Sequence, residues 1–157
     1  MERIKSSRLA REIEEMDGVR KVHYLNPAAE RLNKSLGDAV GMQHLGAHLI
    51  TVDPGHQSTE YHVHHFEEEC IYVLSGRGLA VLGEQLQPIG PGDFIGCPAN
   101  GVAHELINDG DEPLVCLVVG QRLTHDVVDY PRLEKRLFRN AGEWNLVDQG
   151  DIEHVKR

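Results

Sequence analysis

The middle of the chain, from about residue 19 to residue 120, consists of short apolar runs separated by turn-forming residues. The runs are four to nine residues long, and those at 71–74 and 114–119 contain several β-branched side chains. Such side chains fit the pleated, half-buried surface of a sheet, and many short strands with turns between them are typical of an antiparallel sandwich or barrel. The pattern therefore predicts an all-β fold. The turn clusters lie at 36–38, 53–55, 75–78, 90–93, 98–101 and 108–111.

Residues near the N-terminus follow a different period. Leu9, Ile13 and Met16 recur at the spacing of a helix face. This spacing predicts a short amphipathic helix over 7–16 that ends at Gly18.

The residues after the central region are more polar, and Pro131 favours the start of a helical turn among them. We expect this extension to pack on the outside of the barrel or on a second subunit. The sequence thus predicts three parts, namely an N-terminal helical segment at 1–18, a barrel at 19–120 and a C-terminal extension at 121–157.

Composition narrows the class of protein. The chain has 157 residues, which suits one domain, and its 40% hydrophobic and 26% charged residues are typical of a globular protein. Lys and Arg number 16 against 25 for Asp and Glu, and the resulting net charge of −9 argues against nucleic acid or an anionic membrane as a partner. No apolar run approaches the ~20 residues of a membrane span, and residues 1–7 do not form a signal peptide. We expect a cytoplasmic protein.

The chain contains three cysteines, Cys70, Cys97 and Cys116, at wide spacing. The number is odd, and no two of them form a C-x-x-C pair. In a reducing compartment we expect them to be small buried apolar side chains.

Histidine is unusually frequent, and the informative cluster lies at 62–65. Because successive side chains of a strand alternate between faces, His62 and His64 point the same way and His65 points the other way. Two imidazoles ~7 Å apart along one face can converge on a single metal ion. The cluster therefore indicates a metal site.

A carboxylate and a further histidine extend this candidate site. Glu69 begins the next strand with the parity of Ile71 and Val73, the positions expected inside the barrel. If the two strands form a hairpin, Glu69 lies beside the histidine pair and supplies an oxygen ligand. His104 begins a strand after the turn at 98–101 and is a candidate for the fourth ligand.

These residues resemble the first motif of the cupin superfamily, G-x5-H-x-H-x(3,4)-E-x6-G. Four residues separate His64 from Glu69, and six separate Glu69 from Gly76. One departure is that six residues, rather than five, lie between Gly55 and His62. The extra residue falls in a turn, where an insertion displaces no ligand.

The segment 92–108 resembles the partner motif of the same family, G-x5-P-x-G-x2-H-x3-N. Its departure is a second residue between Pro98 and Gly101, again in a turn. The 15 residues between the two motifs, 77–91, are similar in number to those of bacterial single-domain cupins. The matching residues are Gly92, Pro98, Gly101, His104 and Asn108.

The resemblance implies a double-stranded β-helix, the small jelly-roll barrel of the cupins, with one divalent metal ion in its mouth. Within the superfamily the chain is similar to small cupins described as sugar-phosphate isomerases. The metal ligands implied by the two motifs are His62, His64, Glu69 and His104.

We assign the other polar residues near the motifs to turns rather than to the main ligand set. We interpret His65, Glu67 and Glu68 as a solvated turn. Glu68 is the alternative carboxylate ligand if the motif is aligned with three intervening residues instead of four. For Asn108 we expect a role in capping the turn at 108–110.

The proposed donors determine which ions and reactions fit. Three imidazoles and one carboxylate, without sulfur, suit Zn²⁺, Ni²⁺, Mn²⁺ or Fe²⁺. Octahedral coordination leaves two open positions, which distinguishes a reactive centre from a closed structural zinc site. We therefore expect Lewis-acid catalysis of proton transfer next to a carbonyl, as in an aldose–ketose isomerase acting on a sugar or sugar phosphate.

Candidate catalytic bases around the barrel mouth are His44, His48, Glu60 and Tyr61. The two histidines lie on the expected strand 42–52 with even spacing and so share one face. That face is either the barrel mouth or an outer surface.

The motifs contain no recognisable cradle for a phosphate group. Neither a Gly-rich P-loop nor a basic cluster lies near them, because Arg132, Lys135 and Arg136 fall outside both motifs. This absence argues against a phosphorylated substrate.

Two other functions fit the same four ligands, and whether the chain is an enzyme stays open. An iron dioxygenase would use the open positions for O₂ and substrate, whereas a metal-dependent small-molecule binder or sensor would show no turnover. The 18 residues before the barrel are too few for a helix-turn-helix domain. We expect a homodimer, formed through edge strands or through the terminal segments.

Overall fold

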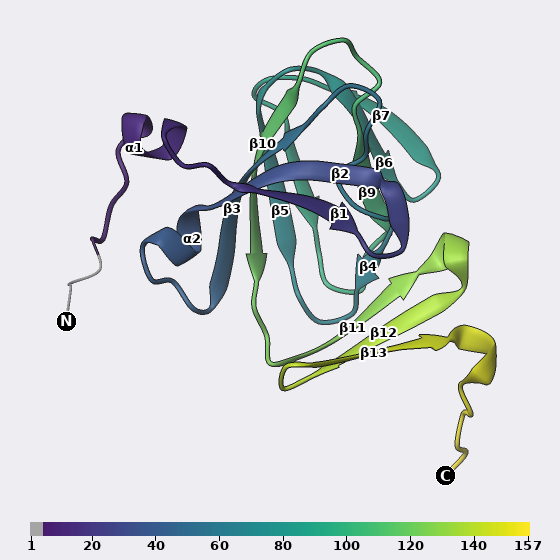
Figure 1. Cartoon of the computed structure of the whole chain (residues 1–157). Coiled ribbons are helices and arrows are strands. Elements are labelled where there is room, and N and C mark those ends of the chain that lie inside the picture. Colours follow the sequence, from purple (N-terminus) through teal and green to yellow (C-terminus); the bar gives the residue numbers. More distant parts are fainter. Residues whose placement is uncertain (1–4) are drawn as a thin grey trace.

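Antiparallel strands form most of the structure, a computed structural model that describes residues 5–157 (Figure 1). Residues 1–4, which belong to the expected N-terminal segment, lie outside the described residues. The largest sheet has six strands, in the spatial order β1 (Val19–His23), β2 (Asn26–Ser35), β3 (Leu45–Val52), β10 (Leu114–Gln121), β5 (Glu69–Ser75) and β8 (Phe94–Cys97).

A three-stranded sheet completes the barrel, and the core lies between it and the large sheet. Buried apolar side chains from both sheets form a single cluster. Val52, Val73 and Leu114 of the large sheet are 0% exposed, and Leu106 of the small sheet is 1% exposed. The small sheet consists, in spatial order, of β7 (Gln85–Ile89), β6 (Gly78–Leu82) and β9 (His104–Ile107).

The all-β barrel predicted from the sequence is confirmed, and so is the expected parity along β5. Ile71 and Val73 are both buried in the core. Cys97 and Cys116 are free and buried, as expected, whereas Cys70 is only partly buried. Burial raises the pKa of the Cys116 thiol to about 12, so this side chain is an inert apolar group.

The helices are shorter than the sequence suggested. The expected N-terminal helix is present as α1 (Ala10–Glu14), which has five residues and buries none of them, so that no packing extends it.

The strand expected at 42–52 begins only at Leu45, because α2 (Leu36–Ala39) and the turn after it occupy the preceding residues. Within residues 5–157, no helix has both the length and the apolar character that crossing a membrane requires.

The C-terminal residues form most of a third sheet, which has four strands and lies at one end of the barrel (Figure 1). In spatial order it contains β13 (Glu143–Asp148), β12 (Lys135–Asn140), β11 (His125–Tyr130) and β4 (Val63–His64). Because β4 comes from the central part of the chain, its pairing with β11 attaches the C-terminal extension to the barrel. Pro131 opens a single 3₁₀ turn, η1 (Pro131–Leu133), between β11 and β12, as the sequence suggested.

Three glycines of the sequence motifs, Gly55, Gly76 and Gly92, have positive φ angles, and the last two differ in the space around them. Gly76 has a φ of 78°, and a Cβ atom there would lie 2.2 Å from the carbonyl oxygen of Pro113. Gly92 has a φ of 92°, and a Cβ atom there would meet nothing within 4 Å. Position 76 therefore requires glycine for space as well as for conformation.

We expect Gly76→Ala to lower the free energy of unfolding by about 2 kcal/mol more than Gly92→Ala does. Both substitutions carry the cost of a left-handed backbone, roughly 1–2 kcal/mol, but only the first drives a methyl group into the Pro113 carbonyl. Urea denaturation of both variants and the unsubstituted chain measures the difference. Equal losses in the two variants would contradict the steric explanation.

Candidate metal centre

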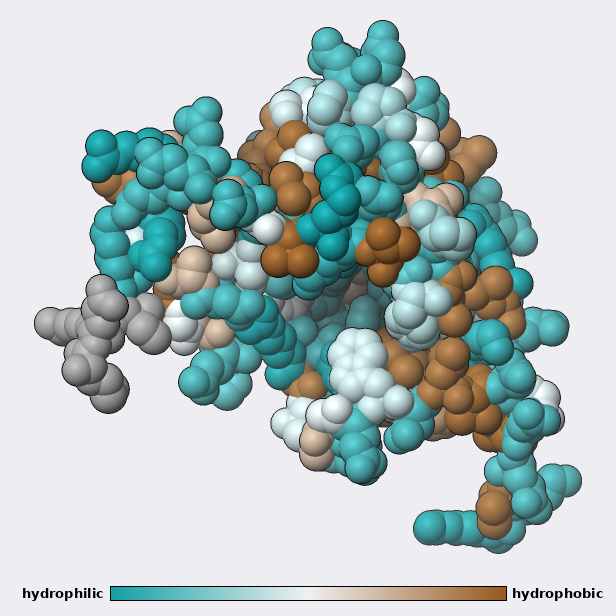
Figure 2. Space-filling model, in the orientation of Figure 1, coloured by the Kyte–Doolittle hydropathy of each residue, from teal (hydrophilic) through white to brown (hydrophobic). Residues whose placement is uncertain are grey.

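A cavity of about 470 Å³ lies between the large sheet and the C-terminal sheet. Figure 2 shows a hollow near the middle of the face in view. The apolar part of the wall includes Ile50, Ile71, Leu106, Val118 and Val128. A cavity of this size, with an apolar part and many polar side chains in its wall, suits a small polar molecule. We refer to it as the barrel cavity.

All four side chains singled out by the sequence motifs line the barrel cavity. The ring centroid of His62 lies 4.9 Å from that of His64 and 4.6 Å from that of His104. The Nε2 atom of His104 lies 3.4 Å from Oε1 of Glu69. Groups from two distant segments of the chain are thus brought to one place.

The prediction that a hairpin brings Glu69 beside the histidine pair is wrong. β4 pairs with β11, and the backbone of His62 forms an isolated antiparallel bridge with His104, with N···O distances of 3.2 and 2.8 Å. These partners occupy the hydrogen-bonding edges of the short histidine segment. Glu69 reaches the cavity instead from β5, which lies between β10 and β8 in the large sheet.

His62 is held in one tautomer by the backbone. It is 8% exposed, and its Nδ1 atom lies 2.8 Å from the carbonyl oxygen of Glu60. Because a carbonyl oxygen only accepts hydrogen bonds, Nδ1 carries the proton and Nε2 keeps its lone pair. Burial, followed by the neighbouring His104 and His64, lowers the pKa of His62 to about 3. The ring is therefore neutral, with Nε2 free to bind a metal ion.

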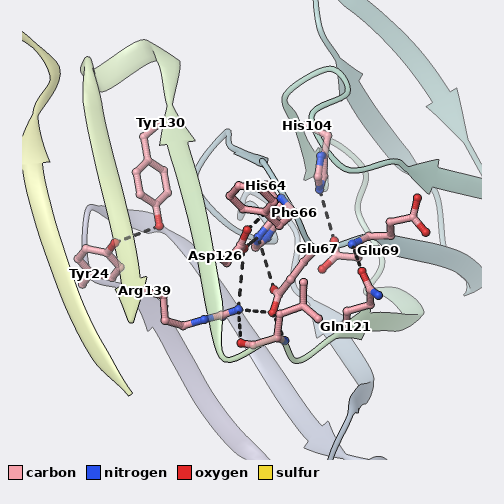
Figure 3. A network of polar contacts seen from close by, with 12 residues as sticks. Tyr24, His64, Phe66, Glu67, Glu69, His104, Gln121, Asp126, Tyr130 and Arg139 are labelled. Atoms are coloured by element: carbon pink, nitrogen blue, oxygen red, sulfur yellow. Dashed lines mark hydrogen bonds and ion pairs between the residues drawn. The ribbon is translucent and has the colours of Figure 1, made fainter. Parts of the chain in front are cut away.

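His64 is fixed by a buried carboxylate of the C-terminal sheet (Figure 3). Its Nδ1 atom donates to Oδ2 of Asp126 at 2.5 Å, while Oδ1 of Asp126 accepts the backbone N–H of Phe66 at 3.1 Å. Asp126 is 2% exposed. Burial alone would raise the pKa of Asp126, but the contact with His64 lowers it. A carboxylate that holds one ring nitrogen leaves the other in position to bind a metal.

Glu67, interpreted from the sequence as part of a solvated turn, is buried. It is 6% exposed, and its Oε1 atom accepts the backbone N–H of Leu123 at 2.7 Å and a hydrogen bond from Arg139. Its Oε2 atom lies 3.6 Å from Nδ1 of His64 (Figure 3). A buried carboxylate needs such partners. They come from the C-terminal extension, so residue spacing near the motifs could not reveal them.

Two residues near Glu67 in the sequence, His65 and Glu68, are less buried than Glu67. Glu68 is exposed, as expected for a turn residue. His65 places its Nε2 atom 2.9 Å from Oδ2 of Asp129, and Arg136 donates to both oxygens of the same carboxylate at 2.6 and 2.8 Å. Arg136 and then His65 lower the pKa of Asp129 to about 2, which keeps this link between the loop and β11 ionised.

Cys97 lies next to the candidate metal ligands. The sequence interpretation did not predict this position, because it treated Cys97 only as a buried apolar side chain. One ligand atom from each of Glu69, Cys97 and His104 lies within 4.8 Å of the others, because Cys97 pairs with Glu69 across β5 and β8. Burial acts to lower the pKa of His104, but Cys97 and Glu69 raise it to about 10. Burial acts to raise the pKa of Glu69, but His104 and then His62 lower it to about 2. The buried Nδ1 atom of His104 has no hydrogen-bond partner among the described residues.

Of the four candidate bases, His48 lines the barrel cavity. Nδ2 of Asn33 lies 3.1 Å from Nδ1 of His48. Because an amide nitrogen only donates, the neutral ring carries its proton at Nε2. Burial, followed by the charge of Lys21, lowers the pKa of His48 and keeps the ring neutral. In this arrangement His48 presents an N–H donor at Nε2, and its role as a base stays a prediction.

The other three candidate bases do not belong to the wall of the cavity. His44 is exposed. Glu60 is buried and accepts a hydrogen bond from Nδ2 of Asn26 at 2.7 Å, and the Tyr61 hydroxyl donates to the carbonyl of Gly83 at 3.0 Å.

The cavity wall also contains polar residues that the sequence interpretation did not identify. Lys21, Arg31 and Arg139 line it, although no basic cluster is visible near the motifs. These cations come from β1, β2 and β12, so only the pairing of strands brings them together. Tyr24 and Tyr130 also line the cavity, with their hydroxyl oxygens 3.0 Å apart.

The barrel and its cluster of histidines are typical of a cupin, and comparison with known proteins supports this classification. The family model described as "Cupin domain" matches residues 48–120. A crystal structure from Acidithiobacillus ferrooxidans, of a protein named as a candidate sugar phosphate isomerase, is 58% identical to this chain. The match covers 98% of both chains, with a TM-score of 0.95. The chain belongs to the cupin superfamily.

Two less similar structures show how widely the barrel is used. A sugar phosphate isomerase of the cupin superfamily from Silicibacter pomeroyi is 26% identical, over 88% of this chain and 93% of that chain, with a TM-score of 0.77. The polyketide cyclase RemF from Streptomyces resistomycificus is 28% identical, over 58% of this chain and 64% of that chain, with a TM-score of 0.51. None of the curated proteins matches the chain significantly. Function must therefore be argued from the cavity rather than from the fold.

We expect Asp126→Asn to reverse the tautomer of His64. In the native protein Oδ1 of Asp126 accepts the Phe66 N–H, so the oxygen of the new amide stays there and its NH₂ group faces His64. An amide NH₂ donates to Nδ1, which moves the ring proton to Nε2 and removes the lone pair from that atom. Nitrogen-15 NMR of the labelled histidines reports the tautomer.

The matched control for this measurement is Asp129→Asn. It removes the same charge from the same strand, but its carboxylate contacts His65 and Arg136 instead of His64. His64 should keep its proton at Nδ1 in this control. An Nδ1-protonated His64 in Asp126→Asn as well would show that Asp126 does not set the tautomer.

Proposed function

We propose that the chain is a metal-dependent isomerase of a small sugar or sugar phosphate. The observation that carries the proposal is that two histidines of the barrel cavity, His62 and His64, have Nδ1 bound to an oxygen acceptor and Nε2 free. Once an ion displaces the proton that His104 holds against Glu69, these two residues complete a donor set of three imidazoles and one carboxylate, which Zn²⁺, Ni²⁺, Mn²⁺ and Fe²⁺ all accept. The names of the two similar isomerases support the choice of reaction.

A divalent ion bound by these four residues would supply a Lewis acid that polarises a carbonyl oxygen. The other contributions come from the chain itself. The carboxylate of Asp126 and the carbonyl of Glu60 hold the rings of His64 and His62 in the orientation that a ligand needs. The apolar wall excludes water from part of the cavity, which strengthens every polar contact made inside it.

Isomerisation also requires a proton to move between neighbouring carbon atoms of the substrate, and donors on the wall can hold the substrate oxygens next to those atoms. The hydroxyls of Tyr24 and Tyr130, 3.0 Å apart, share one hydrogen bond, so one hydroxyl hydrogen of the pair is left for a substrate oxygen. Burial, followed by the contact with Tyr24, raises the pKa of Tyr130, so its hydroxyl stays protonated. His48, with its proton at Nε2, can donate a hydrogen bond to a substrate oxygen.

We expect His62→Ala and His104→Ala each to lose most of the bound metal while the barrel stays folded. Each substitution removes one of four ligands, whereas the core consists of other side chains. Elemental analysis after reconstitution with Zn²⁺, Ni²⁺, Mn²⁺ or Fe²⁺ measures the metal, and circular dichroism measures the fold. The exposed His44 gives the control, because His44→Ala should keep one ion per chain. Full metal content in both ligand variants would remove the ligand assignment.

We expect the metal-reconstituted protein to interconvert an aldose or aldose phosphate with the corresponding ketose without consuming O₂. Proton NMR in D₂O measures the reaction, because proton transfer next to the carbonyl exchanges the hydrogen on that carbon with solvent. His62→Ala should lose the activity together with its metal. Oxygen uptake coupled to loss of substrate would instead identify an iron dioxygenase. Saturable binding without product or exchange would identify a non-catalytic binding protein.

A further inference from the structure

The charge of the barrel cavity is opposite to that of the chain. The net charge is −9, yet the described residues of the wall include Lys21, Arg31 and Arg139 and a single carboxylate, Glu69. Arg139 is already paired with the buried carboxylate of Glu67. Glu69 is one of the candidate ligands. Lys21 and Arg31 are therefore the charges on the wall that the site described above does not explain.

Lys21 and Arg31 lie directly opposite each other on β1 and β2. The next residues of the same parity, His23 and Asn33, also line the cavity, so this face of the strand pair is part of its wall. Like charges at directly opposite positions destabilise a strand pair. An anion between the two side chains would remove this repulsion.

The guanidinium of Arg31 has unused hydrogen-bond donors. One of its terminal nitrogens donates to the carbonyl oxygen of Ser58, but its buried Nε atom has no partner among the described residues. Within residues 5–157, Arg31 forms no ion pair with a carboxylate. Arg20 on β1, by contrast, pairs with Glu30 at 2.6 Å. A half-buried cation whose charge has no carboxylate partner is suited to a ligand of opposite charge.

Ser58 adds a neutral donor to the same wall. It is 6% exposed and lines the cavity. Its Oγ atom accepts the backbone N–H of Leu106 at 3.0 Å, which leaves the hydroxyl hydrogen available to another acceptor. The wall therefore offers two cations and a hydroxyl, in a cavity that also holds the candidate metal ligands.

We propose that Lys21 and Arg31 bind the phosphate group of a phosphorylated substrate at the β1–β2 wall of the barrel cavity. A phosphate monoester carries close to two negative charges at neutral pH, which matches two cations, whereas a carboxylate matches only one. The planar guanidinium can also donate to two phosphate oxygens at once. The anion site stands on these contacts, while the statement that the bound molecule is isomerised rests on the proposed function.

Binding of inorganic phosphate to the full-length chain tests this site. Trp144 is the only tryptophan in the sequence and lines the cavity, so its fluorescence reports on a ligand that enters there. The titration is made on the protein as purified and after removal of metal by a chelator, because a metal ion could bind phosphate by itself. We expect saturable binding in both samples that weakens as the salt concentration rises.

We expect Arg31→Met to weaken phosphate binding by about tenfold and Lys21→Met by about threefold, because a charge-assisted contact is stronger when it is shielded from water. The matched control is Arg20→Met, which removes a neighbouring charge whose side chain pairs with Glu30 and not with the cavity, and should change the affinity less than about twofold. Lys21 is exposed, so its substitution leaves the fold intact even if Arg31→Met does not fold. Unchanged affinity in Lys21→Met, or loss of all binding on metal removal, would overturn the proposal.

Kinetics then separate this inference from the proposed function. Lys21→Met should raise KM for a sugar phosphate and leave KM for the unphosphorylated sugar unchanged. Phosphate binding at the pair without any isomerisation would support the anion site and contradict the proposed function. Isomerisation of unphosphorylated sugars by a chain that does not bind phosphate would contradict the anion site alone.

Discussion

The hydrogen bond between Asp126 and His64 joins the C-terminal sheet to the barrel. Burying a carboxylate without partners is costly, and Asp126 is almost wholly buried, so its two oxygens need the His64 ring N–H and the Phe66 backbone N–H. β11 must therefore lie against the loop that follows β4. Glu67 and Arg139 make a second buried contact between the same two parts of the chain. The cavity beside His64 exists because these charges are satisfied across the junction.

Much of the barrel and the identity of the clustered side chains could be predicted from the sequence. A strand buried on one face alternates apolar and polar residues, so Ile71 and Val73 were recognisable as core positions. The motif spacing likewise selected the histidines and the glutamate that line one cavity. The route by which they meet was not predictable, because neighbours in sequence are not neighbours in this barrel. His62 bonds to the backbone of His104, and the expected hairpin with Glu69 does not form.

The remaining features of the site depend on strand pairing that no local pattern encodes. Glu67 looks like one of three exposed turn glutamates until Arg139 is brought to it from β12. Lys21 and Arg31 look like ordinary surface residues until β1 and β2 are set in register. The absence of a basic cluster near the motifs therefore said little about the charge of the cavity. A strongly acidic chain can still present a locally positive wall, because the total charge does not determine its distribution.

The residues of the barrel cavity fall into two groups by their place in the chain. All four candidate ligands lie within residues 48–120, whereas Lys21, Arg31 and Trp144 come from strands before and after that stretch. Substituting these three side chains would thus change which molecules the cavity admits, whereas Asp126 on β11 has to stay because it holds His64. In a barrel built this way, new binding preferences can arise at the margins of the chain while the candidate metal ligands in its middle stay the same.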